Sequence, residues 1–243
     1  MWEKYPNISA YAYCALNPVK YIDPTGMFIN PIYDLSGNFL GTDDKGLQGF
    51  GFAMEIENFK QGMKHSEAMN YISAIPDKVQ AKISAHVDGL KNRPDYDGFV
   101  TIEEGINWAK EHPYALENPT PDNSLYINTA LLNFGNISSS QLNIGKPTPV
   151  NLFNVDNFAE SLFNSTLRAT IYALGRVNIM LESNVDETFR IINDSATDYD
   201  WNKGGGFIRD NFIKAERYRT GLDDRHGFKV FYYGLGKLNR QLF

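Results

Sequence analysis

The sequence has few of the residue types and motifs that mark several common classes of protein. A single cysteine, Cys14, among 243 residues excludes an intrachain disulfide and argues against a zinc site built on cysteines. Four histidines occur without a His-Glu-x-x-His pattern, and neither a Gly-x-Gly-x-x-Gly motif nor a Gly-Lys-Ser/Thr phosphate loop is present. No apolar run approaches the roughly 18 residues that a membrane-spanning helix needs. We therefore expect no membrane span and no disulfide framework.

The chain carries a moderate negative charge that is unevenly distributed. The net charge of −6 argues against a general nucleic-acid-binding protein, because phosphate neutralisation needs a surplus of lysine and arginine. From residue 201 to the end, nine cations stand against four anions, so this part is +5 and residues 1–200 carry −11. A basic end on an acidic protein suits an anionic small substrate or an acidic partner, and it leaves nucleic acid open as a ligand. The alternative is a solvated helix face.

The first 27 residues differ from the rest of the chain. The stretch "KYPNISAYAYCALNPVKYIDPTGM", residues 4–27, is rich in tyrosine and proline and shows neither a helical period nor the alternation of a strand. It is too short to bury a core of its own. We therefore expect that residues 1–27 do not form an independent domain.

This stretch resembles the end of the Rhs/YD-repeat-associated core of bacterial polymorphic toxins, in the form that closes on Asn-Pro-Val-Lys-Tyr-Ile-Asp-Pro-Thr-Gly. The resemblance covers residues 3–27. In that family the core is the last part of a large β-cage, and a variable C-terminal domain with its own activity follows it. The resemblance therefore implies a stub of the core at residues 1–27 and a variable toxin or effector domain at residues 28–243.

The same resemblance carries expectations about location, partners and processing. It implies a bacterial protein that is exported as part of a larger Rhs protein, with the Rhs core cage and a cognate immunity protein as partners. The N-terminus has no basic region followed by an apolar run, so we expect no signal peptide in this chain. Asp23 falls in the Asp-Pro-x-Gly segment, near which some members of the family use aspartates for self-cleavage. The alternative for this segment is a plain β-turn.

The first half of the remaining chain combines one hairpin signal with several helical signals. Residues 31–40 place a Ser-Gly-Asn turn between apolar residues, which indicates a short hairpin. Residues 58–112 predict helices, and Thr101 with Glu104 forms a capping box for a helix that stops before Pro113. An apolar stripe at helical spacing consists of Val79, Ile83, Val87 and Leu90.

The second half predicts mainly strands. Residues 166–182 alternate between apolar and polar side chains, which predicts one long strand with a bend at Gly175. Residues 187–194 and 226–238 predict further strands, and residues 206–222 predict one helix bounded by glycines. The expected fold is α+β, with a helical N-terminal half followed by an antiparallel sheet that carries one late helix.

Ionisable side chains concentrate between Asp194 and His226. Asp194, Asp198, Tyr199 and Asp200 follow an expected strand and precede three consecutive glycines. If the strand continues, Asp198 and Asp200 share one side and Tyr199 lies on the other. Two close carboxylates raise the pKa of one of them, which suits an acid–base pair or a site for Mg²⁺ or Ca²⁺. The alternative is a solvated turn rich in aspartate.

The late helix and the loop after it add further candidates. Helical spacing brings Arg209, Glu216 and Arg217 close to one face, where the two arginines could bind phosphate and Glu216 could orient one of them. His226 titrates near neutral pH and could act as a general acid or base beside the acidic pair 223–224. The alternatives are a helix stabilised by surface ion pairs and an ordinary loop histidine.

The run "ALGRVNI" followed by "DYDWN" and a basic segment resembles the catalytic end of colicin M-type bacteriocins. That family hydrolyses lipid II, a lipid-linked pyrophosphate, through a metal-dependent Asp/Tyr-Asp motif with a His-Arg pair soon after. Tyr199 and Asp200 match the Tyr-Asp element. The first aspartate of the motif falls on Thr197, so Asp198 would replace it, and the histidine and arginine occur in reversed order as Arg225-His226.

Together these features predict a hydrolase that acts on a phosphate-containing substrate, either a lipid-linked pyrophosphate or a nucleic acid. The expected divalent cation, Mg²⁺ or Ca²⁺, would bind Asp198 and Asp200. The catalytic residues would be Asp198, Asp200 and His226, and the substrate contacts would be Tyr199, Arg209 and Arg217. The alternative is a non-catalytic binding or structural module associated with an Rhs cell-surface or secreted protein.

Overall fold

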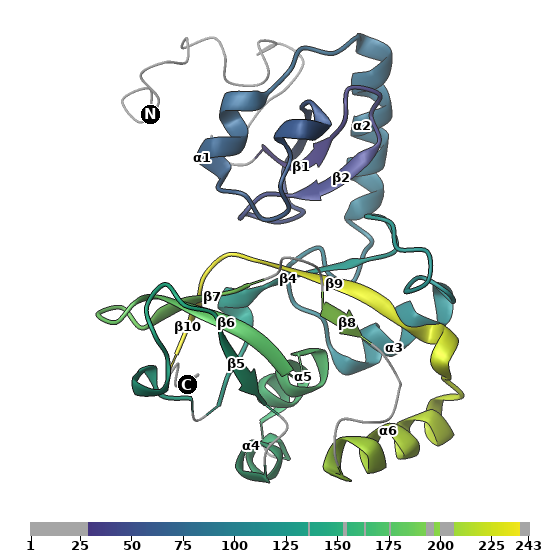
Figure 1. The fold of residues 1–243 in the computed structure, drawn as a ribbon. Helices are drawn as coiled ribbons and strands as arrows, with labels where there is room; N and C mark the ends of the chain where they lie inside the picture. The colour runs from purple at the N-terminus through teal and green to yellow at the C-terminus, as the bar shows by residue number, and fades with distance from the viewer. Residues whose placement is uncertain are drawn as a thin grey trace. The chain divides into compact units, whose positions relative to one another are not determined.

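The computed structural model describes residues 29–135, 137–152, 155–162, 164–174, 176–192, 197–199 and 207–238. The chain divides into two compact units, unit 1 (Met1–Asn92) and unit 2 (Arg93–Phe243). In the described part of the chain, each unit is built around its own hydrophobic core. The elements of both units are labelled in Figure 1.

Unit 1 is a small sheet accompanied by two helices. The strand order is β2-β1-β3, in which β2 is antiparallel and β3 is parallel to the central β1. Its core joins strand and loop residues, among them Ile32, Phe52 and Met63. The elements are β1 (Ile29–Tyr33), β2 (Phe39–Thr42), β3 (Phe50–Ala53), η3 (Ile56–Asn58), α1 (His65–Ala68), η4 (Met69–Tyr71) and α2 (Asp77–Leu90).

The predicted hairpin at residues 31–40 is confirmed as β1 and β2. Asp34 Oδ1 accepts hydrogen bonds from the backbone N–H groups of Ser36 and Asn38, both at 2.8 Å. Gly37 has φ +75°, in the left-handed region that a residue with a Cβ rarely adopts. The aspartate and the glycine therefore set the turn from local sequence alone.

The predicted apolar stripe is also confirmed, and it packs α2 against β3. Ile83, Val87 and Leu90 are buried on one face of α2. The helix lies so close to the sheet that a Cβ on Gly51 would stand 2.5 Å from Ile83 Cγ2 and 3.0 Å from Val87 Cγ2. Gly51 is thus required by the close approach of helix and strand.

Unit 2 contains two sheets and four helices among its described residues. One sheet has the order β10-β7-β6-β5 and is antiparallel throughout. The other has the order β4-β9-β8, with β4 parallel and β8 antiparallel to β9. The elements are α3 (Ile102–Glu111), β4 (Leu125–Asn128), η5 (Thr129–Leu131), η6 (Ser139–Gln141), β5 (Thr148–Asn151), α4 (Val155–Ser161), α5 (Ser165–Leu174), β6 (Arg176–Ser183), β7 (Thr188–Ile191), β8 (Thr197–Tyr199), α6 (Phe207–Thr220), η7 (Asp224–His226), β9 (Phe228–Tyr233) and β10 (Gly236–Lys237).

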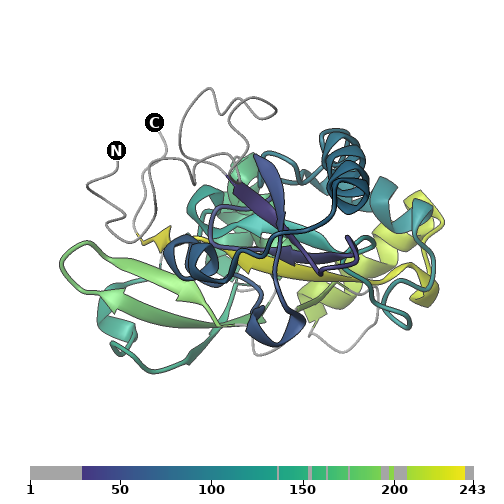
Figure 2. The same ribbon diagram turned by 90° about the horizontal axis from the view of Figure 1, so that it is seen from above.

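One core holds both sheets of unit 2 together with α3 and α5. Val177, Ile179 and Leu181 of β6 point into it, as do alternate residues of β9. Figure 2 shows β6 and β7 side by side, joined by a tight turn, in agreement with their antiparallel register. The core fixes β9. Strand β9 in turn fixes β8 and η7, which carry Asp198, Tyr199 and His226 of the predicted site.

Three local predictions in unit 2 are confirmed. Helix α3 begins with the capping box, because Thr101 Oγ1 accepts from the backbone N–H of Glu104 at 3.2 Å and Glu104 Oε2 accepts from the backbone N–H of Thr101 at 2.8 Å. Helix α6 and strands β7 and β9 lie within the ranges that predicted them. Within the described residues no helix has both the length and the apolar character to cross a membrane, as expected.

The prediction of a helical N-terminal half is wrong. The chain is α+β, but its described part opens with the three strands of unit 1, and α2 and α3 follow in the middle of the chain. The second sheet of unit 2 is mixed, because β4 is parallel to β9. Of the three strands of unit 1, β3, which contains Gly51, is the one that the sequence did not predict.

The single long strand predicted for residues 166–182 is also wrong. Its first part is α5 and its second part is β6. Leu167, Thr170 and Ile171 are the buried residues at helical spacing, and Asn164 Oδ1 accepts from the Leu167 N–H at 2.9 Å. The spacing of Leu167 and Ile171 fits both the period of a strand and the period of a helix. The hydrogen bond from the Leu167 N–H to Asn164, which caps the helix, favours the helix. Gly175, the expected bend, lies outside the described residues.

Candidate functional site

Strand β8 carries the first two predicted site residues, and the register with β9 decides which way they point. Asp198 lies opposite Lys229 and Tyr199 opposite Phe228. Lys229 Nζ donates to Asp198 Oδ1, and the carboxylate is half exposed. The Tyr199 ring stacks on Phe228 with ring centroids 4.7 Å apart, against the core of unit 2. Asp198 and Tyr199 therefore point to opposite faces, as the alternation predicted.

Helix α6 places Arg217 beside η7. Gly221, with φ +74°, follows the last helical residue, and its N–H donates to the Arg217 carbonyl at 2.9 Å. This left-handed residue turns the chain back along the final turn of the helix. As a result Arg217 Nη1 lies 2.9 Å from Asp224 Oδ1, two residues before His226. The Arg217 side chain of α6 thereby reaches η7, the turn that contains His226. The sequence predicted these two residues separately.

The turn η7 is organised by Asp223, which caps it. Asp223 Oδ1 accepts from the Arg225 N–H at 3.0 Å, and the Arg225 guanidinium donates Nε–H and Nη2–H to the same carboxylate at 2.7–3.1 Å. These bonds from Arg225 hold the pKa of Asp223 well below its usual range. The carboxylate is therefore ionised at any physiological pH.

His226 is held by Asp223 in both of its protonation states. Its Nδ1 lies 3.0 Å from the backbone nitrogen of Asp223 and 2.8 Å from Asp223 Oδ1. Neutral imidazole can accept the backbone N–H at Nδ1, and imidazolium can donate Nδ1–H to the carboxylate. The two bonds alternate because one nitrogen cannot accept and donate at once. In either state the ring is fixed through Nδ1, and proton exchange with a substrate is left to Nε2.

A residue that the sequence did not indicate, Tyr114, lies against the same turn. Its N–H donates to the Arg225 carbonyl at 2.6 Å, and the Leu116 N–H donates to the Gly227 carbonyl at 2.9 Å. Hydrogen bonds to Asp223 and then to Tyr114 raise the pKa of Arg225. Tyr114 has φ +67°, which costs a bulky residue about 1–3 kcal/mol. The segment after α3 contains no motif that would have predicted this contact.

A buried arginine anchors the loop that carries Tyr114. Arg93 donates to both oxygens of the fully buried Asp95, at 2.9 and 2.8 Å, and to the carbonyls of Asp122 and Ser124. Its guanidinium lies 4.7 Å from the centroid of the Trp108 ring of α3. The loop is thus tied down at its far end by the two hydrogen bonds from Arg93 to the carbonyls of Asp122 and Ser124, and at its near end by the contact with η7.

The described contacts gather part of the predicted site. Arg217 pairs with Asp224 of η7, two residues before His226. The end of β8 lies close to Gly227, the residue after His226, because the Tyr199 carbonyl oxygen is 3.2 Å from where a Cβ on Gly227 would stand. Asp198 is engaged by Lys229 on the β8–β9 pair. Asp194, Asp200 and the side chain of Arg209 lie outside the described residues.

Of the two expected cation ligands, the described residues include only Asp198. Among the residues that the structure describes, no group of three or more His, Cys, Asp or Glu side chains could hold a metal ion. The Asp198 carboxylate already binds the ammonium group of Lys229, whose positive charge would repel a cation. The second expected ligand, Asp200, lies outside the described residues.

The site thus consists of a histidine held by a carboxylate and two arginines on adjacent turns. Such groups can bind an anion and transfer a proton to it. The chain matches no protein-family model, no curated protein and no solved structure.

Proposed function

We propose that the chain is the C-terminal effector domain of an Rhs-type polymorphic toxin and that it hydrolyses a phosphate-containing substrate at η7 and the end of α6. The resemblance of residues 3–27 to the Rhs-associated core supports the toxin assignment. The ion pair of Arg217 with Asp224, which belongs to the same short turn as His226, supports the choice of site, because it brings an anion-binding cation from α6 to the turn that carries the histidine.

In this proposal each side chain has one task. Arg217 and Arg225 bind the phosphate oxygens through charged hydrogen bonds. A water molecule adds to phosphorus, the bond from phosphorus to the leaving oxygen breaks, and that oxygen takes a proton from imidazolium His226. Asp223, which remains ionised, accepts the Nδ1–H bond of the imidazolium and stabilises its charge. The water loses its proton to solvent.

A second candidate function is a non-catalytic binding module, and one observation favours it. The charged side chains of the site form pairs within the protein: Arg217 with Asp224, Arg225 with Asp223, and Asp198 with Lys229. Such a network is also typical of a surface that is stabilised by ion pairs or that docks a charged partner. The two functions differ in whether His226 is needed for more than binding.

Toxicity in a bacterium tests the proposal. The full 243-residue chain is expressed from a repressed promoter, either in the cytoplasm or behind a secretion signal, and growth is followed after induction. We expect growth arrest in at least one compartment. We expect His226→Ala to relieve it, since general acid–base groups contribute about 10²–10⁴-fold to rate. Arg217→Ala should also relieve it.

The matched control is Lys214→Ala, which removes an exposed cation from the same helix. This variant should remain as toxic as the unmodified chain. Unimpaired growth with the unmodified chain in both compartments would contradict the toxin assignment. Arrest that survives His226→Ala would remove this residue from the mechanism and favour the binding module. Circular dichroism of each variant shows whether the fold is retained.

A further inference from the structure

We propose that the substrate of this site is a single-stranded nucleic acid, bound along a strip formed by Tyr114, Arg225, Arg217 and Tyr218. The proposal rests on the proposed function for the location of the chemistry and chooses between its two substrate classes. Single strands are bound by aromatic rings that stack on bases and by cations that contact the phosphates between them. The strip supplies both kinds of group in alternation.

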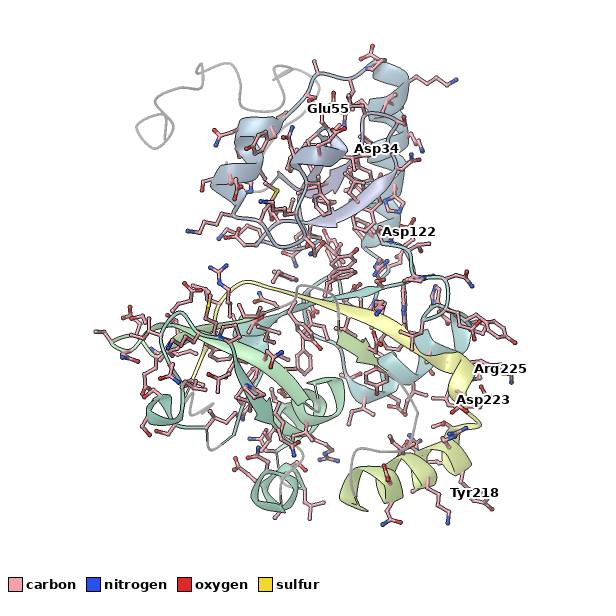
Figure 3. The ribbon with its side chains drawn as sticks, viewed as in Figure 1. Asp34, Glu55, Asp122, Tyr218, Asp223 and Arg225 are labelled. Carbon is pink, nitrogen blue, oxygen red and sulfur yellow. The ribbon has the colours of Figure 1, made fainter. Side chains whose placement is uncertain are left out.

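The members of the strip are connected through contacts around η7. The backbone N–H of Tyr114 donates to the carbonyl oxygen of Arg225 at 2.6 Å. Asp224, the neighbour of Arg225 in η7, pairs with Arg217 at 2.9 Å, and Tyr218 follows Arg217 on α6. Figure 3 shows Arg225 and Tyr218 along the same side of unit 2, with Asp223 between them. His226 is part of the same turn, so a phosphodiester on the two arginines would lie beside the proton donor.

Both tyrosines of the strip present their rings to solvent. Tyr218 is 95% exposed and Tyr114 is 44% exposed. A fully exposed tyrosine contributes little to folding, because its ring buries almost no apolar surface. Tyr114 occupies a left-handed conformation that glycine or asparagine would adopt with less strain. An aromatic residue at each of these positions is therefore better explained by a planar ligand than by the fold.

Arg225 can contact a phosphate without abandoning its carboxylate partner. Asp223 engages Nε and Nη2 of its guanidinium, whereas a guanidinium has five N–H donors. The side chain is 55% exposed, so an incoming phosphate can reach it. Single-strand binding through such contacts weakens as the salt concentration rises.

The described side chains of this surface favour a nucleic acid over a lipid-linked pyrophosphate. The lipid chain of such a substrate needs a contiguous apolar surface. The exposed side chains that the structure describes on α6 and η7 are polar, charged or tyrosine, apart from the small Ala215. They are Asn211, Lys214, Ala215, Tyr218, Arg219, Asp224 and Arg225.

Binding is tested with the full chain and two probes. Fluorescence anisotropy measures the affinity for a labelled 12-nucleotide single strand, as RNA and as DNA, at two salt concentrations. A competing sample contains vesicles that carry a polyprenyl pyrophosphate. We expect the oligonucleotide to bind, and to bind more weakly at the higher salt concentration. We expect the vesicles not to displace it.

Two variants test the strip itself. Tyr218→Ala keeps a good helix former on α6, and Tyr114→Asn keeps a residue that tolerates the left-handed backbone. Loss of one stacked base corresponds to an affinity lower by about 5–150-fold, so we expect each variant to fall in that range. Tyr71→Ala, which removes a tyrosine 38% exposed on unit 1, is the matched control and should bind like the unmodified chain.

The outcomes separate this proposal from the proposed function. Tight oligonucleotide binding that both strip variants leave unchanged would overturn the strip, and preferential binding to the pyrophosphate vesicles would overturn the substrate class. Neither result would bear on toxicity. Conversely, loss of binding in both strip variants supports the strip even if the unmodified chain does not arrest growth, in which case the toxin assignment fails alone.

Discussion

Removing the buried arginine of unit 2 should strongly destabilise that unit. Arg93→Ala leaves Asp95, whose side chain is 0% exposed, without its counter-charge. The two guanidinium hydrogen bonds to Asp95, at 2.9 and 2.8 Å, disappear, and the carboxylate keeps the backbone N–H of Tyr126 at 2.7 Å. Breaking a buried pair by deleting one partner costs about 3–5 kcal/mol. The lost contact with the Trp108 ring is worth about 0.5–2 kcal/mol of interaction.

This magnitude is large compared with the stability of a typical domain. Domains unfold with a free energy of about 5–15 kcal/mol, so the substitution removes about a fifth or more of it. For a unit of the size of residues 93–243, each kcal/mol shifts the melting temperature by about 2–4 °C. A loss of about 3–5 kcal/mol therefore lowers the melting temperature by about 6–20 °C.

The assay is urea denaturation followed by tryptophan fluorescence and far-UV circular dichroism. Lys91→Ala is the control, because Lys91 forms an exposed ion pair with Asp88 at the similar distance of 2.7 Å. Exposed pairs contribute about 0–1 kcal/mol, so the control should lie close to the unmodified chain. Asp95→Asn, which keeps the shape of the side chain and removes the charge, should also be strongly destabilised. If Arg93→Ala unfolds at the same urea concentration as Lys91→Ala, the reasoning from buried charge is refuted.

Two further predictions concern local stability. Burial raises the pKa of Asp43, which lies 2.5 Å from His65 Nδ1, so the folded unit binds this proton more tightly than the unfolded chain. The stability from this group is present below the ordinary aspartate pKa of about 3.9 and is lost as the pH rises through the raised value. Asp43→Asn should flatten the dependence of the melting temperature on pH in the window just above 3.9, and an unchanged slope would contradict this. Thr101→Ala removes the capping box of α3 and should lower the free energy of unfolding by about 1 kcal/mol, whereas Thr101→Ser, which keeps the hydroxyl, should lower it by less than half of that.

The parts of the fold that the sequence predicted correctly are those with local determinants. The hairpin of unit 1 follows from Asp34 and Gly37, which act within five residues of each other. The start of α3 follows from Thr101 and Glu104, and the end of α6 from Gly221. In each case a residue fixes the conformation of the backbone next to it in the sequence.

The parts that could not be predicted depend on contacts between distant segments. The parallel pairing of β4 with β9 joins Leu125 to Val230, and no local pattern distinguishes it from an antiparallel pairing. Tyr114 reaches the site because the loop after α3 pairs with η7 and β9, more than 100 residues along the chain. The site was predicted from the charge of its aspartates. The partner of Asp198 is Lys229, and this pairing depends on the β8–β9 register, which the sequence does not show.

The internal pairing of the charges predicts how the site responds when a carboxylate is removed. Asp224 is 66% exposed and holds Arg217 at 2.9 Å, so a bound phosphate must compete with it for the guanidinium. At roughly 6 Å and an effective dielectric constant between about 20 and 80, a carboxylate repels a phosphate charge by about 0.7–2.8 kcal/mol. Asp224→Asn should therefore bind a single-stranded oligonucleotide at least about threefold more tightly at low salt, with little effect on stability because the pair is partly exposed. Asp186→Asn, at the exposed turn between β6 and β7, makes the same change in net charge and should leave the affinity unchanged. Weaker binding in Asp224→Asn would mean that the carboxylate positions Arg217 for the ligand, and it would refute the competition between Asp224 and phosphate on which this expectation depends.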